Sequence, residues 1–158
     1  MMMLSNAQTP LGRMGVRGYV TNQEFGGLRI PVTVQSMVLR DYAAKNKLSF
    51  ELPVGEYFFP NCYVQLDGLL RQLDELTGIM MCSLFMLPKS EVRRREIYDL
   101  IIRHGCALHM VFESLVILSA VDADRAEEII RFQDTLRACP QKIPAELLPP
   151  IEAIDHFA

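Results

Sequence analysis

Apolar residues along the chain follow two different periods, and stretches of the two kinds alternate. Runs that are continuously apolar, or apolar at every second position, predict buried or half-buried strands. These runs lie at residues 15–21, 48–52, 78–88 and 106–112, with a short edge strand at 115–118. Between them, apolar residues recur every three or four positions, which predicts helices at residues 31–47, 62–76, 90–104 and 123–136. Strands that alternate with helices are typical of an α/β fold with a parallel sheet.

The run from Gly78 to Pro88 carries no charged residue and is the expected central strand of this sheet. It is too short to span a bilayer. Amphipathic segments on both sides of it favour a crossover arrangement over an isolated buried helix. We therefore expect a three-layer sandwich on a mostly parallel sheet of four or five strands. The expected strand order is 2-1-3-4, as in flavodoxin-like sheets, with the edge strand as a fifth.

Polar and special residues at the ends of the periodic stretches predict where the helices begin and end. Their side chains cap free N–H groups or break the helical conformation. The expected N-caps are Asn61, Ser90 and Asp122, and the expected terminators are Gly78, Gly105 and Pro140.

The length of 158 residues predicts one domain, which we place at residues 15–139. Residues 1–14 offer little periodic apolar surface and are expected to form a flexible arm. Residues 140–158 form a Pro-rich tail whose apolar residues predict docking, either on its own domain or on a partner. Because the last helix and the tail add apolar surface to an already complete core, we also expect a homo-oligomer, most simply a dimer.

Composition narrows the classes of function. The formal charge of -3 gives no overall attraction to nucleic acid or to anionic membranes, so neither is an expected partner. The start of the chain has neither the basic flank nor the long apolar core of a signal peptide, which predicts a cytoplasmic location. The four cysteines are far apart, and we expect them to be reduced and buried rather than bound to zinc. No metal or cofactor is expected, since no ligand cluster and no Gly-rich nucleotide-binding motif occurs.

Polar residues follow the expected strands at their carboxyl ends, where ligands bind in open α/β sheets. The residues in this set are Thr21, Asn22, Arg29, Glu56, Ser83 and Glu113. The stretch from Ser83 to Pro88 is the expected floor of a pocket. Arg29, beside two glycines and the helix that begins at Pro31, suits a phosphate or carboxylate group.

Each of these candidates has an ordinary structural alternative. Glu56 lies among aromatic residues, so it is either a carboxylate poised for proton transfer or a cap for its own loop. Ser83 has no nucleophile motif around it, which favours a hydrogen-bonding role. His109 is either a core imidazole or a proton-transfer group. Arg94 is either an anion contact or part of a solvated helix face.

Several blocks of the sequence resemble the catalytic domain of serine recombinases, or resolvases. The blocks are residues 17–21 (Arg-Gly-Tyr-Val-Thr), the helix from Gln35 to Leu48, residues 69–73, the central strand and residues 104–113. The resemblance spans residues 15–135 and implies a resolvase-like fold. The first block has no secure nucleophilic serine, and residues 83–88 contain no arginine. We therefore expect the chain not to be a recombinase.

A second resemblance is to the sporadic carbohydrate cluster proteins, which occur with bacterial surface-polysaccharide genes. The shared blocks are residues 17–19 (Arg-Gly-Tyr), 25–31 (Phe-Gly-Gly-Leu-Arg-Ile-Pro), 39–42 (Leu-Arg-Asp-Tyr) and 83–88 (Ser-Leu-Phe-Met-Leu-Pro). This resemblance implies a cytoplasmic role in making a glycan precursor.

Together these observations predict an enzyme that binds an activated sugar, either a nucleotide-sugar or a sugar phosphate. In this hypothesis Arg29 and Arg40 contact the anion, although Arg40 has Asp41 and Glu51 as alternative partners. Glu56 or Glu113 transfers the proton. Tyr19 and Gln35 from the shared blocks, with Thr21, Asn22 and Arg94, complete the substrate contacts, and Ser83 and His109 are further catalytic candidates. The alternatives are a non-catalytic subunit of a glycan pathway and, third, a degenerate resolvase-like DNA-binding protein.

Overall fold

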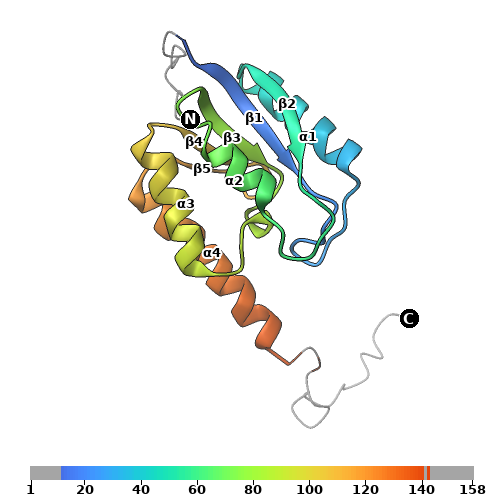
Figure 1. The fold of residues 1–158 in the computed structure, drawn as a ribbon. Coiled ribbons are helices and arrows are strands. Elements are labelled where there is room, and N and C mark those ends of the chain that lie inside the picture. The colour runs from blue at the N-terminus through green and yellow to red at the C-terminus, as the bar shows by residue number, and fades with distance from the viewer. Residues whose placement is uncertain (1–11, 141, 143–158) are drawn as a thin grey trace, which may run out of the picture.

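A five-stranded sheet forms the centre of the protein (Figure 1). The structure, a computed structural model, describes residues 12–140 and 142. The strands are β1 (Met14–Val20), β2 (Phe50–Gly55), β3 (Leu76–Met81), β4 (Ala107–Met110) and β5 (Leu115–Ile117). Their order is β2-β1-β3-β4-β5, and all neighbours are parallel except β4 and β5. The predicted α/β class, strand order and edge strand are confirmed.

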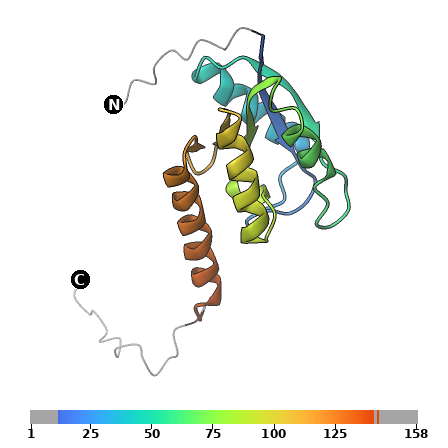
Figure 2. The same cartoon turned by 60° about the vertical axis from the view of Figure 1, so that its left-hand side comes forward.

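Within the described residues, four α-helices cover the two faces of this sheet. They are α1 (Val32–Lys45), α2 (Val64–Leu70), α3 (Glu91–Arg103) and α4 (Ala120–Ala138). Figure 1 shows α1 on one face, over β1 and β2, and α2, α3 and α4 on the other. Figure 2 shows α4 beside α3, with its C-terminal half running past the sheet. All four residues of α4 that are buried lie between Ala123 and Ile130, which agrees with this view.

The central position of β3 follows from its composition. Ile79, Met80 and Met81 are fully buried, and β1 and β4 pair with β3 on its two sides. At Gly78 the neighbouring strand comes so close that a Cβ atom would lie 2.2 Å from the carbonyl oxygen of Ala107. The strand thus needs glycine at this position.

The central strand is shorter than predicted. It ends at Met81, and the chain then leaves the sheet through a short 3-10 helix, η1 (Leu84–Met86). Ser83 causes this change of direction, because its hydroxyl accepts the backbone N–H of Phe85 at 3.2 Å and so caps η1. Residues 83–88 therefore form a buried turn rather than the end of a strand.

Two predicted helix caps are wrong, and so is the terminator Gly78, since α2 already ends at Leu70 and Gly78 lies within β3. Two other signals are confirmed. Ser90 caps α3 and Gly105 follows its end with a positive φ of 63°. α4 is capped by Ser119, while Asp122 is the third residue of a reciprocal capping box. Asn61 does not cap α2, whose N-cap position is Tyr63 and carries no side-chain bond.

The cysteines are free thiols among the described residues, but they are not all buried as predicted. Cys82 and Cys106 are buried, Cys62 is half-buried, and Cys139 is exposed because it follows the end of α4. Within residues 12–140, no helix is both long and apolar enough to cross a membrane.

Most of the predicted arm, and the tail apart from residues 140 and 142, lie outside the described residues. The domain boundaries at 15 and 139 remain a prediction, as does the homo-oligomer. On α4, Phe132 is 66% exposed and Leu136 is 50% exposed, so this helix does present the apolar surface on which the oligomer prediction rests.

Candidate functional site

The carboxyl ends of the parallel strands bring together three hydrogen-bonded pairs of predicted site residues. The pairs are Tyr19 with Glu56, Thr21 with Gln35, and Ser83 with Glu113. They come from β1, from α1, and from the segments that follow β1, β2, β3 and β4. The expected convergence at one edge of the sheet is therefore present in the structure.

Glu56 acts on the start of α2. Its buried carboxylate accepts hydrogen bonds from the backbone N–H groups of Gln65 and Leu66 and from that of Tyr57. The Tyr19 hydroxyl donates a fourth bond at 3.0 Å. Burial raises the pKa of Tyr19, and the negative charge of Glu56 raises it further. These contacts fit the structural alternative, in which Glu56 is a cap, and they explain why α2 needs no side-chain cap of its own.

Gln35 ties the end of β1 to the start of α1. Its side-chain Nε2 donates to the carbonyl oxygens of Thr21 at 2.6 Å and Ile30 at 2.7 Å, and its Oε1 accepts the Thr21 N–H at 3.0 Å. The side chain is fully buried. The hydroxyl of Thr21 accepts the N–H of Gln23. Both side chains thus close the loop at residues 22–30 instead of pointing at a ligand.

Ser83 and Glu113 form the third pair. The Ser83 hydroxyl donates to Glu113 Oε1 at 2.6 Å, and the Leu84 N–H donates to Glu113 Oε2 at 3.0 Å. Ser83 is buried, in agreement with the hydrogen-bonding role favoured by its sequence context. Burial and the negative charge of Glu113 raise the pKa of the neighbouring Cys82 thiol to about 12, so this thiol stays protonated.

One hollow at this edge of the sheet is almost closed. The crevice beside the ends of β1 and β3 has a volume of about 20 Å³, which is room for a single water molecule. Its lining residues are Tyr19, Thr21, Gln23, Glu24, Phe25, Tyr63, Phe85 and Met86. None of them is a cation. This crevice therefore has neither the volume nor the charge for an activated sugar. Four residues of the predicted floor, Leu84, Phe85, Leu87 and Pro88, line a larger groove of about 540 Å³ on the side of α4.

His109 lies apart from the three pairs, within the core on the side of the sheet that α1 covers. Its Nδ1 is 3.2 Å from the Tyr42 hydroxyl of α1, and the two rings pack edge to face. Burial lowers the pKa of His109 to about 4, because a charged imidazole would lose its hydration there. The imidazole is therefore neutral at pH 7. This placement matches the core alternative.

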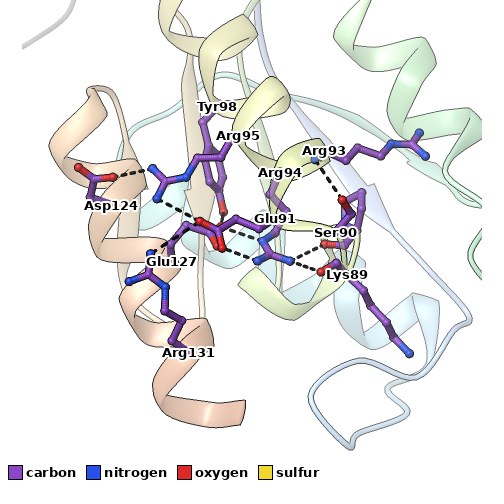
Figure 3. Close-up of polar contacts among 11 residues, drawn as sticks. Lys89, Ser90, Glu91, Arg93, Arg94, Arg95, Tyr98, Asp124, Glu127 and Arg131 are labelled. Carbon is purple, nitrogen blue, oxygen red and sulfur yellow. Dashed lines mark hydrogen bonds and ion pairs between the residues drawn. The ribbon is translucent and has the colours of Figure 1, made fainter. Parts of the chain in front are cut away.

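Arg94 is neither an anion contact nor part of a solvated face. Figure 3 shows its guanidinium between α3 and α4, where it donates to both carboxylate oxygens of Glu127 at 2.8 and 2.7 Å. It also donates to the carbonyl oxygens of Pro88 and Lys89. The Tyr98 hydroxyl completes the cluster with a bond to Glu127 at 2.9 Å. The Glu127 carboxylate is thus hydrogen-bonded within the protein by Arg94 and Tyr98.

The exposed candidates are Asn22, Arg29 and Arg40. Within residues 12–140, neither arginine side chain makes a hydrogen bond or an ion pair. The suggested partner of Arg40, Asp41, pairs instead with Lys45 at 2.6 Å. Arg40 lies on α1, whereas Arg29 lies on the loop at the carboxyl edge of the sheet. Of the two, only Arg29 stands near the three pairs.

Two residues at the centre of these arrangements are missed by the sequence reasoning. Glu127 occupies a buried position of α4, three residues before Ile130 and four after Ala123. The sequence could have identified it as a carboxylate on the apolar stripe of this helix. Gln23 donates to the carbonyl oxygens of Tyr57, Phe59 and Cys62 and so fixes the β2–α2 loop. Nothing in the local sequence distinguishes Gln23. In the part of the chain that the structure describes, no three His, Cys, Asp or Glu side chains gather as metal ligands would.

Comparisons with known proteins identify the fold. No family model and no curated protein matches the sequence. The structure is similar to the N-terminal catalytic domain of TP901-1 integrase, with 14% identity, a TM-score of 0.53, and coverage of 76% of this chain and 98% of that chain. It is also similar to a resolvase family site-specific recombinase from Streptococcus pneumoniae, with 8% identity, a TM-score of 0.56, and coverage of 78% and 91%. The chain therefore has a resolvase-like α/β fold.

These structures overturn the functional predictions made from the sequence. Both relatives come from recombination proteins, which contradicts the predicted role in carbohydrate biosynthesis and the predicted sugar-modifying enzyme. They equally contradict the expectation that the chain is not a recombinase and has no nucleic-acid partner. Of the two resemblances in the sequence, the one to recombinases extends to the fold.

Proposed function

We propose that this protein is a resolvase-like protein that binds DNA. The observation that carries the proposal is the likeness to recombination proteins, which extends over 98% of the integrase domain and 91% of the recombinase chain. The proposal takes up the third alternative from the sequence and includes the cytoplasmic location predicted there.

We expect DNA to bind where the protein offers exposed cations. Proteins hold DNA mainly by neutralising phosphates with Lys and Arg. Since the formal charge of the chain is -3, binding depends on local cations. Arg29 is suited to this role because it is exposed and has no hydrogen-bond or ion-pair partner within the described residues. Its planar guanidinium offers two parallel donors to a phosphate group.

We propose DNA binding rather than DNA cleavage because the side-chain hydroxyl groups at this edge of the sheet are buried and hydrogen-bonded. Nucleophilic attack by a side-chain hydroxyl requires an accessible oxygen and a neighbouring base. Thr21 and Ser83 are both buried, and each hydroxyl is engaged in a hydrogen bond. Ser83 does have a carboxylate beside it in Glu113, so the assay below includes a test for DNA cleavage.

The experiment measures fluorescence anisotropy of a labelled DNA duplex at about 50 mM and about 200 mM salt. We expect binding that weakens steeply with salt, and an Arg29→Gln variant whose slope of log K against log salt is shallower by about one. The matched control is Arg103→Gln, which removes an exposed arginine from the last turn of α3, at the opposite end of the sheet. The same samples are incubated with supercoiled plasmid, and nicking would extend the function to cleavage. No binding at the lower salt, or equal effects of the two variants, contradicts the proposal.

A further inference from the structure

An open groove lies beside the edge that carries the candidate site. It is walled by the turn at residues 24–27, by η1 and the residues after it, and by the C-terminal half of α4. Its volume is about 540 Å³, which is within the range of pockets that hold small ligands or short peptide segments. None of the hydrogen-bonded pairs described above fills it.

The floor of the groove is apolar and its rim is charged. Phe25, Leu84 and Leu87 are buried, while Phe85 is half-buried and faces Gly26. The rim carries two exposed cations, Lys89 and Arg137, and two exposed acids, Glu24 and Asp134. The exposed charges of the rim balance, and Arg94, which also lines the groove, is buried and paired with Glu127.

The position of the groove at the end of α4 points to its occupant. Ile130, Asp134 and Arg137 all line the groove, and Arg137 stands in the last turn of the helix. The chain therefore leaves α4 at the rim of the groove. Residues 139–146 alone, fully extended, can span about 27 Å, which is enough to reach any part of it.

The sequence that follows α4 has the composition that the groove requires. Residues 143–158 contain Leu147, Leu148, Ile151 and Ile154 and no Lys or Arg. Prolines at 144, 149 and 150 restrict the backbone before any contact is made, which lowers the entropy lost on docking. A tethered segment also acts at an effective concentration in the millimolar range, so a weak apolar contact is sufficient.

We propose that this groove is an intramolecular docking site for the C-terminal segment 143–158, with Leu147 and Leu148 against its apolar floor. The proposal rests on the groove and on the composition of the segment, and it is independent of DNA binding.

A single tryptophan tests the proposal in the full-length protein, because the natural sequence contains none. In a Leu148→Trp variant we expect the emission of a buried indole, shifted to shorter wavelength than that of the same variant unfolded in urea. The shift should be lost when Phe85→Ala opens the wall of the groove, with thermal unfolding used to check that this variant is folded. Emission typical of water in the folded Leu148→Trp protein overturns the proposal.

Hydrogen exchange provides a second measurement. A Leu147→Asp/Leu148→Asp variant should exchange at least about tenfold faster at residues 24–28 and 84–89, while α1 keeps its rate as an internal reference. The control, Ala145→Asp/Ala153→Asp, adds the same charges but keeps both leucines, and should leave the rates unchanged. Equal rates in the wild type and the leucine variant overturn the proposal. Dependence of the tryptophan shift on protein concentration overturns its intramolecular form, because it means that a second copy supplies the segment.

Discussion

The guanidinium of Arg94 and the carboxylate of Glu127 form a buried, two-point ion pair that joins α3 to α4. The two residues are 33 positions apart, and the carboxylate is completely buried. Burial by itself would raise the pKa of Glu127, but the hydrogen bonds from Arg94 and Tyr98 outweigh it and hold this pKa below its ordinary value. The pair therefore stays charged at pH 7 and positions the start of the groove wall formed by α4.

Breaking this pair should be strongly destabilising. We expect Glu127→Ala to lower the free energy of unfolding by roughly 3 to 5 kcal/mol, because it leaves the Arg94 charge buried without its partner. Changing both residues, as Arg94→Met/Glu127→Leu, should lower it by less than the two single changes together. Urea unfolding measures both effects. The control is Arg95→Met, which breaks a more exposed pair with Asp124 between the same helices and should cost about 1 kcal/mol or less. Similar losses from Glu127→Ala and Arg95→Met would contradict this reading of the buried pair.

The buried His109 should make the protein sensitive to acid. The pKa of its imidazole is about 4 in the folded chain and 6.5 ordinarily, so the unfolded chain binds the proton first as the pH falls. Stability is therefore retained above about pH 6.5 and lost between this pH and about 4, with a loss of about 2 kcal/mol by about pH 5. When the free energy of unfolding is measured against pH, this loss should appear in the wild type and be absent from His109→Phe. His104→Gln, at a half-exposed position, is the control and should keep the dependence.

Glu56 should be important for folding rather than for chemistry. Glu56→Ala removes the acceptor for the start of α2 and for the Tyr19 hydroxyl, and we expect it to lower the free energy of unfolding by about 2 to 4 kcal/mol. Tyr19→Phe removes one of these bonds and should cost about 1 kcal/mol. Glu24→Ala, at an exposed position, is the control and should change stability by less than about 0.5 kcal/mol. A fully stable Glu56→Ala protein that had lost DNA binding would instead place Glu56 in the functional site.

The exposed apolar residues of α4 should mediate self-association. Phe132 and Leu136 are one helical turn apart, and they lie on the opposite side of α4 from Ile130 and Asp134, which line the groove. We expect light scattering to show a dimer at micromolar concentration, and a monomer for Phe132→Ser/Leu136→Ser. Val92→Ser, which removes a single exposed valine from α3, should remain a dimer. A wild-type protein that is a monomer at these concentrations would show that the prediction is wrong.

Local sequence determined most of the architecture of this protein. The apolar run that became β3, the Ser90 cap and the Gly105 stop are read from neighbouring residues, because strand burial and helix ends depend on contacts within a few positions. The alternation of strands and helices predicted a parallel sheet, and the order expected by analogy with flavodoxin-like sheets is the order observed. The same reasoning overextended β3 to Pro88, where the hydroxyl of Ser83 turns the chain into η1.

Only the tertiary structure decided what the polar residues do. Tyr19 and Glu56 are 37 residues apart, Ser83 and Glu113 are 30 apart, and Arg94 and Glu127 are 33 apart. Read singly, each is a candidate for binding or catalysis, because a polar side chain at a strand end is available to a ligand until a partner occupies it. Folding supplies these partners from distant segments, since a buried polar group without a hydrogen bond would be costly. The sequence by itself therefore determined where the polar groups would gather. Tertiary packing decided that they bind one another and that the open space beside residues 84–88 lies on the side of α4.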